Sequence, residues 1–314
     1  MNMRYSAPFI HTDRNDAYFS AVHLLSLIPI MAVAVVYYGL RAAILLLFCS
    51  LLFAVTDDIC SRIRKVSRGS ILNPLFYGAV FALLLPPDTP LYIAFTGVMF
   101  AALVVRQISG GRGSAFINPP AAGRLFIRIV FPLNEGALAM PCADRTSVKS
   151  LLLGSSGFEG FDLSKYYQSE IFMGRYPSFL GTACAFMILA GLVYILAKRA
   201  VRFYAPLSYI GMLTILLLLR DLRNETSETM LFLATTGVLF TAVYLLFDEE
   251  TVRSFGTVSI TSAFVCAALT FLLSFKTGGI DLIVVPVVLT GVLTGILDYG
   301  GKIIKVYGEE KQSV

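Results

Sequence analysis

Ten apolar runs follow one another along this chain with few charges inside them, and this repetition constrains the fold more than any other feature. They cover residues 19–39, 41–56, 71–86, 91–105, 117–132, 178–197, 206–220, 230–247, 256–275 and 280–298. A helix that crosses a bilayer needs roughly 20 apolar residues, and fewer when neighbouring helices shield its ends. Hydrophobic residues make up 57% of the chain and charged residues only 14%, against roughly a quarter charged in a soluble domain. The sequence therefore predicts an all-α integral membrane protein with about ten transmembrane helices.

The distribution of Lys and Arg predicts the orientation, because basic residues near the ends of spans stay on the cytoplasmic side. With the N-terminus inside, the cytoplasmic segments hold fifteen of the 25 basic residues and the outer segments hold eight. The remaining two, Arg124 and Arg128, lie within the fifth run. The net charge of +5 is then explained by topology and needs no nucleic-acid partner. We expect a multi-pass protein of the cytoplasmic (inner) membrane with both termini inside.

One polar segment divides the chain into two groups of five apolar runs. Residues 1–132 form the first membrane half, residues 133–177 an outward-facing loop, and residues 178–314 the second membrane half. Halves with an odd number of spans have opposite topology, as in many transporters that place a site at a pseudo-twofold axis. The halves also share a polar break after the third and eighth runs and a glycine pair after the fourth and ninth. These features predict two inverted five-helix halves with broken helices.

A stretch rich in Gly, Asn and Pro, residues 110–124, separates the fourth and fifth runs. Non-helical backbone at membrane depth is tolerated only where protein or a wet cavity satisfies it, so this break marks a predicted working site. Gly110, Gly111 and Asn118 are candidates to line an ion pathway, since broken helices offer carbonyls and helix dipoles to ions. The alternative for Asn118 is a helix cap, a role that Asn favours, with Pro119 in the first turn.

Arg124 and Arg128 are one helical turn apart and share a helix face. Charges inside a membrane usually face the protein interior or a wet cavity, so either guanidinium could pair with a flavin phosphate, a carboxylate or another subunit. Snorkelling to the interface is the alternative for Arg124, which lies nearer the cytoplasmic end of the run. Arg128 is therefore expected to be the more informative of the two.

Taken together, these features resemble the D subunit of Rnf complexes (ferredoxin:NAD⁺ oxidoreductases) and the B subunit of sodium-pumping NADH:quinone reductase. The resemblance extends over most of the chain and rests on the order and spacing of short elements. They are Ser6-Ala7-Pro8-Phe9-Ile10, Tyr38-Gly39-Leu40-Arg41, the Leu85–Pro90 turn, the Gly110–Arg124 stretch with Asn118-Pro119, Phe131-Pro132 and Leu297-Asp298-Tyr299. The resemblance implies a subunit of a redox complex in which electrons cross flavins while Na⁺ or H⁺ is moved.

The family attaches FMN through a phosphoester to a Thr in an outward-facing D-x-x-S-G-A-T motif. The corresponding stretch here runs from Asp144 to Ser150, with Asp144 and Ser147 matching and Ser150 at the acceptor position. Val148 and Lys149 replace the family's Gly and Ala. The resemblance therefore implies covalent FMN on Ser150, and the altered pair favours the alternative of a loop that carries no flavin. A second flavin such as riboflavin could bind among the spans.

Asp248 follows the eighth run, where the family has a T-D-P-V-T-S-P-like sequence. Its carboxylate could suit Na⁺ in an ion pathway, although adjacent acids at a membrane edge are more often a solvated turn. The five cysteines show no close metal-ligand spacing, so no metal site is expected.

The sequence thus predicts a membrane subunit that relays electrons through flavin and couples their transfer to Na⁺ or H⁺ translocation. It would not be catalytic alone, and its expected partners are a flavin-carrying sister subunit and small membrane subunits. Two alternatives stay open. One is a stand-alone channel or solute permease, which the inverted architecture also suits. The other is a structural subunit of the complex that lacks its own flavin.

Overall fold

The structure is a computed structural model that describes residues 16–65, 70–109, 111, 117–132, 172–174, 176, 178–199, 204–224, 229–246, 256–274 and 283–296. Helices α1 (Asp16–Tyr38), α2 (Leu40–Ile63), α3 (Leu72–Leu83) and α4 (Leu91–Met99) come first, and the π-helix η1 (Phe100–Gln107) continues α4. They are followed by α5 (Pro119–Val130), α8 (Ala185–Ala197), α9 (Tyr204–Asn224), α10 (Thr229–Thr235), α11 (Val238–Phe240), the π-helix η3 (Thr241–Leu245) and α12 (Gly256–Leu273). An apolar helix over Ile283–Ile296 comes last.

Every one of the ten predicted runs contains helix, and the elements of the described part are helical, which confirms the all-α fold class. In the part of the chain that the structure describes, two helices, Ala17–Tyr38 and Leu40–Ile63, are long and apolar enough to cross a membrane. The other apolar helices are shorter, among them Leu72–Leu83 and Ala185–Ala197. A helix of 12 residues is about 18 Å long, so a further stretch of chain is needed to complete a crossing of roughly 30 Å.

Three runs that were expected as single spans are interrupted in the structure. The run 71–86 leaves the helix after Leu83, because Pro86 and Pro87 lack the amide hydrogen that continues a helix. The run 178–197 becomes helical only at Ala185. The run 230–247 is broken at Gly237, whose φ of +78° belongs to the left-handed region that glycine adopts without strain. The two inverted halves stay a prediction.

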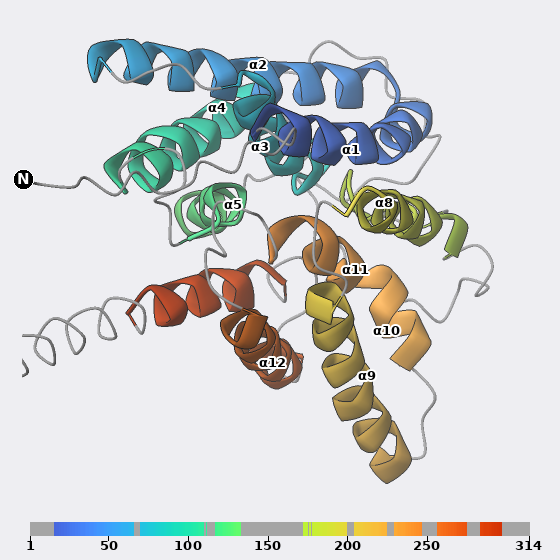
Figure 1. The fold of residues 1–314 in the computed structure, drawn as a ribbon. Coiled ribbons are helices and arrows are strands. Elements are labelled where there is room, and N and C mark those ends of the chain that lie inside the picture. The colour runs from blue at the N-terminus through green and yellow to red at the C-terminus, as the bar shows by residue number, and fades with distance from the viewer. Residues whose placement is uncertain are drawn as a thin grey trace, which may run out of the picture.

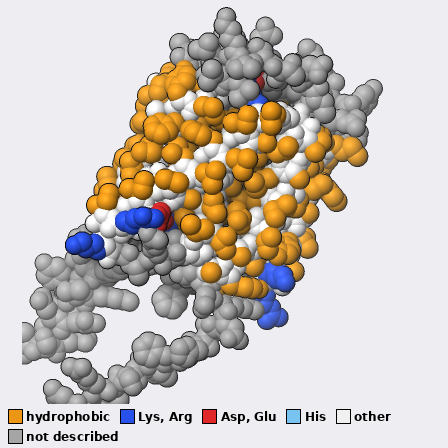
Figure 2. All heavy atoms as spheres, turned by 90° about the horizontal axis from the view of Figure 1, so that it is seen from above, with side chains coloured by type: hydrophobic (Ala, Val, Ile, Leu, Met, Phe, Trp, Pro, Cys, Tyr) orange, Lys and Arg blue, Asp and Glu red, His pale blue; other side chains and the backbone are white. Residues whose placement is uncertain are grey.

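In Figure 1, α1 to α4 lie at the top, α5 and α8 are seen nearly end-on beneath them, and α9 to α12 lie lowest. Helix α2 packs mainly on α3, and α9 mainly on α12. Helix α8, which belongs to the second half by sequence, packs against α1 and also touches α11 and η3. The surface seen from above is largely hydrophobic, with Lys and Arg side chains toward its edges (Figure 2). This distribution suits a protein whose flanks face lipid.

Non-helical backbone from distant parts of the chain meets in the interior. The segment from Phe81 to Pro90 is buried throughout. Its carbonyls at Leu83 and Leu85 accept hydrogen bonds from the amides of Gly181 (2.7 Å) and Leu180 (3.2 Å). A Cβ on Gly181 would lie 2.8 Å from the Leu83 Cβ, so only glycine lets the two backbones approach this closely. Buried polar backbone must be paired, and here each interrupted segment satisfies the other.

Candidate functional site

Asn118 joins the start of α5 to the end of the π-helix η3. Its backbone is extended (φ −64°, ψ 117°), and its Oδ1 accepts a hydrogen bond from the Ala121 amide at 3.1 Å. Its Nδ2 donates to the Leu245 carbonyl oxygen at 3.0 Å, and the residue is only 2% exposed. The helix-cap interpretation of Asn118 is thus confirmed, together with the break in the helix before α5. Its role as a liner of an ion or flavin pathway stays a prediction.

The two arginines of α5 differ in depth. Arg124 is buried, and its guanidinium carbon lies 5.6 Å from the centre of the Phe179 ring, a cation–π distance. Arg128 is exposed in the last turn of the same helix. The alternative that Arg124 snorkels to the interface is therefore wrong, and Arg128, which was expected to be the more informative of the two, is the exposed one. Because α5 begins deep in the protein at Asn118, its first turns are the enclosed ones.

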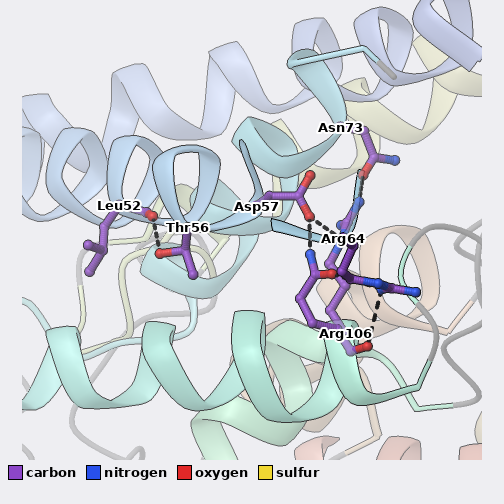
Figure 3. A network of polar contacts seen from close by, with 7 residues as sticks. Leu52, Thr56, Asp57, Arg64, Asn73 and Arg106 are labelled. Carbon is purple, nitrogen blue, oxygen red and sulfur yellow. Dashed lines mark hydrogen bonds and ion pairs between the residues drawn. The ribbon is translucent and has the colours of Figure 1, made fainter. Parts of the chain in front are cut away.

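Arg106 is the centre of a buried polar group that links three elements (Figure 3). Its side chain is fully buried on η1, and its Nε lies 3.1 Å from Oδ1 of Asp57 on α2. Its Nη2 donates to Oδ1 of Asn73 on α3 at 2.7 Å. Its guanidinium carbon also lies 4.8 Å from the centre of the Tyr77 ring. Removing an ion from water costs several kcal/mol, and the carboxylate, the amide and the ring offset that cost together.

Gln107 extends this group to the surface. Its Nε2 donates to Oδ1 of Asp57 at 2.8 Å, and its Oε1 accepts from Nη1 of Arg64 at 3.1 Å. We call Asp57, Arg64, Asn73, Arg106 and Gln107 the Arg106 cluster. Gly111, with φ +91°, donates its amide to the Arg106 carbonyl at 3.0 Å and completes the widened turn of η1. π-Helical turns are rare and occur frequently at functional sites.

A second buried ion pair lies at the opposite end of α2. Arg41 is 5% exposed, and its Nη1 lies 3.3 Å from Oδ1 of Asp88. Its Nη2 donates to the Asp88 backbone carbonyl at 2.8 Å. Asp88 belongs to the buried turn between α3 and α4, so this pair holds the non-helical segment in place.

Similarity to known proteins extends over almost the whole chain. Residues 3–303 match the sequence model of the NQR2, RnfD, RnfE family. The chain belongs to this family. It is 23% identical over 346 aligned positions to the D subunit of the ion-translocating oxidoreductase complex of Escherichia coli O139:H28 (strain E24377A / ETEC), with 98% of each chain covered. It is 22% identical, with the same coverage, to the protein of that name from Escherichia coli (strain K12). Both relatives are named as a subunit of an ion-translocating oxidoreductase complex.

Several of the predicted flavin-binding and ion-pathway residues lie outside the described part of the chain. They are Asp144, Ser147 and Ser150 of the candidate flavin motif, and Gly110 and Asp248 of the candidate ion pathway. Of the predicted site residues, the structure places Gly111 beside Arg64, and Asn118 and Arg124 in the interior. The roles expected for all of them toward flavin or ions stay predictions for this member of the NQR2, RnfD, RnfE family.

The Arg106 cluster was missed by sequence reasoning. The Lys and Arg distribution places Arg64 and Arg106 among the cytoplasmic basic residues and predicts no partner for either. A signal was present, because Asp57 and Arg106 each follow directly after a predicted apolar run, the second and the fourth. By the parity of the spans both positions fall on the same side of the membrane. An acid and a base at neighbouring span ends could therefore have been proposed as a pair.

Proposed function

We propose that this subunit of an Rnf-type complex relays electrons through flavin and couples their transfer to the movement of Na⁺ or H⁺ across the cytoplasmic membrane. The observation that carries the proposal is the junction at Asn118. There the interrupted start of α5 is tied to the carbonyl end of η3, deep in the protein and two turns from the buried Arg124. Transporters place their sites where discontinuous helices meet.

The residues at this junction have chemistry that fits a flavin. Asn118 uses one N–H and one lone pair in the bonds described above, and an Asn side chain has two N–H donors and two acceptor lone pairs. One donor and one acceptor therefore remain for the edge of an isoalloxazine ring. Arg124, a buried cation, suits a phosphate or an electron-rich ring oxygen. Bound flavin would supply one- and two-electron chemistry, while these side chains would orient it.

The covalent site is proposed at Ser150 in the outward-facing loop 133–177. Asp144 and Ser147 match the family motif, and Arg145 and Lys149 are close enough in sequence to offset the charge of an FMN phosphate. A flavin at this position could pass electrons only over short gaps, so the proposal includes a flavin-carrying sister subunit and small membrane subunits as neighbours.

The experiment is to produce the full complex together with its flavin transferase and to measure the mass of the peptide containing Ser150. We expect the added mass of FMN less one water, flavin absorbance in the isolated subunit, and loss of both in Ser150→Ala. Thr146→Ala is the matched control, because it removes a nearby hydroxyl at a variable position of the motif and should leave the peptide modified. An unmodified peptide would reject attachment and favour the structural subunit without flavin, which Val148 and Lys149 also favour.

The coupling proposal concerns Gly110, Gly111, Asn118 and Asp248. In vesicles that contain the complex, Asp248→Asn is expected to lower the ion transported per electron more than the electron-transfer rate. Glu249→Gln, at the next position, is the control. Equal loss in both variants would indicate a solvated acidic turn with no coupling role. Electron transfer that drives no ion movement in the native complex would reject the coupling itself.

A further inference from the structure

The end of α2 combines fixed basic groups with exposed aliphatic side chains at the end of an apolar helix. Arg64 and Lys65 follow directly after Leu40–Ile63, a helix long and apolar enough to cross a membrane, and both are exposed. Ile63 is 74% exposed and Ile108, at the end of η1, is 77% exposed. The neighbouring Arg62 is paired with Asp58 at 2.6 Å, and Arg64 and Lys65 add two further basic groups at this end of the helix.

Arg64 is held in one orientation although it lies on the surface. Its Nη1 lies 3.1 Å from Oε1 and 3.4 Å from the carbonyl oxygen of Gln107. Gln107 is fixed in turn by Asp57, which is paired with the buried Arg106. A long side chain normally loses about 2 kcal/mol of rotamer entropy when it is immobilised. The Arg106 cluster has already imposed that loss, so Arg64 is pre-organised to bind an anion.

The backbone at Lys65 supports the same conclusion. Lys65 has φ +54°, the left-handed conformation that usually ends a helix with glycine. Its amide donates to the Arg62 carbonyl at 3.2 Å, so the residue closes α2. A non-glycine residue in this conformation costs on the order of 1 kcal/mol. A lysine at this position retains a cation where glycine would be more stable.

We infer that Arg64 and Lys65 bind the phosphate of an anionic phospholipid, whose acyl chains lie along the aliphatic face of α2. That face is formed at helical spacing by large branched side chains that are each at least half exposed: Leu47, Leu51, Val55, Ile59 and Ile63. Membrane helices pack against each other through small residues, and this stripe has none, so lipid is a better occupant than a partner helix. Clusters of basic residues beside a membrane helix attract anionic lipid. The inference goes beyond the proposed function and does not depend on flavin or ion coupling.

The test uses the purified full chain in detergent, with phosphatidylglycerol, phosphatidylcholine of the same acyl chains, or sodium phosphate added. Thermal unfolding and the lipid retained per protein, measured by mass spectrometry, are the two readouts. We expect phosphatidylglycerol alone to raise the unfolding temperature. A charge-assisted hydrogen bond is worth enough to change binding by about tenfold, so Arg64→Gln should weaken phosphatidylglycerol binding by about that factor.

Helix α8 supplies matched controls. Lys198 and Arg199 end α8 as Arg64 and Lys65 end α2, with Arg199 also left-handed at φ +52°. Lys198 is exposed, and among the described residues no hydrogen bond holds its side chain as Gln107 holds that of Arg64. Lys198→Gln should therefore change phosphatidylglycerol binding by less than about twofold. Lys65→Gly removes the charge while relieving the backbone, so the lipid-free protein should unfold at the same or a higher temperature and still lose lipid. Arg199→Gly should gain stability without losing lipid.

Gln107→Leu tests the pre-organisation, because it leaves the net charge unchanged and removes the partner of Arg64. We expect several-fold weaker binding of phosphatidylglycerol. Equal effects of Arg64→Gln and Lys198→Gln, or no effect of Gln107→Leu, would overturn the site in favour of diffuse charge attraction. Equal stabilisation by the two lipids, or by sodium phosphate alone, would overturn the assignment to an anionic phospholipid.

Discussion

The two ends of α2 hold buried ion pairs built in opposite ways. At the first turn, α2 supplies the cation, Arg41, and the partner Asp88 comes from a non-helical turn. Near the last turns, α2 supplies the anion, Asp57, and the partner Arg106 comes from a π-helix. The two positions are 16 residues apart, or about 24 Å along the helix. Helix α2 therefore holds an irregular segment in place at each of its two ends.

The two pairs differ in the contacts that each arginine would retain if its carboxylate partner were removed. Arg41 donates to the backbone carbonyl of Asp88 as well as lying near its carboxylate. Arg106 has Asn73 and two aromatic rings besides Asp57, but it is fully buried. A buried charge without its counter-ion is strongly destabilising. The comparison indicates that the pair in the Arg106 cluster is the more sensitive of the two.

The largest expected effect is that of Asp57→Ala, which leaves Arg106 buried without a carboxylate. Breaking such a pair costs about 3–5 kcal/mol, measured as the loss in free energy of unfolding in detergent. Asp58→Ala is the control, because its partner Arg62 is 62% exposed and exposed pairs are worth about 1 kcal/mol or less. The double variant with leucine at both 57 and 106 should recover most of the loss. Similar effects at 57 and 58 would contradict the account of the Arg106 cluster.

A smaller loss in the free energy of unfolding is expected for Asp88→Asn, at the other end of α2. The substitution removes the charge but keeps the backbone carbonyl that accepts from Arg41 at 2.8 Å, so we expect a loss of about 1–3 kcal/mol. Asp57→Asn, measured in the same unfolding experiment, should cost more. If Asp88→Asn proved the more damaging, the difference between the two ends of α2 would be reversed.

The contrast also explains what the sequence could predict. The apolar runs predict where the helices lie, because burial in lipid or protein favours apolar residues along a whole helix. Each predicted run contains helix. The cap at Asn118 was also predictable, since Asn-Pro before an apolar run is a local signal. The pairing of Asp57 with Arg106 joins residues 49 positions apart on packed helices, so only the parity of the apolar runs, and no local pattern, indicates it. The break at Gly237 likewise depends on a single φ angle in a run that reads as continuous.

An intermediate effect is expected at the neutral junction, where no charge is involved. Asn118→Ala removes a helix cap worth about 1 kcal/mol and the hydrogen bond to the Leu245 carbonyl, worth a similar amount, so the free energy of unfolding should fall by about 2 kcal/mol. Asn118→Asp retains a good cap but has no N–H for Leu245. It should therefore lose about half as much, or more if the carboxylate repels that carbonyl. If wild type and Asn118→Ala had the same free energy of unfolding, the hydrogen bonds of Asn118 would not stabilise the fold.

The smallest expected effect concerns Asp221, a buried residue in the last turn of α9, just beyond the apolar run 206–220. Its Oδ2 accepts from the Thr229 hydroxyl at 2.6 Å and the Thr229 amide at 2.8 Å, and Arg220 lies 3.3 Å from Oδ1. The Thr229 hydroxyl is the main cause that lowers the pKa of Asp221 below its ordinary value of 3.8, with the Thr229 amide and Arg220 adding to it.

A carboxyl group with a lowered pKa stabilises the folded state above its unfolded pKa and loses that contribution as the pH falls through the folded value. Wild type should therefore unfold at a higher temperature than Asp221→Asn at pH 6, and the two curves should converge as the pH falls below about 4. Thr229→Val, which removes the hydroxyl, should narrow the gap at pH 6. A gap that persists unchanged into acid would mean that Asp221 acts through its shape and not its charge, unlike the two pairs that hold α2.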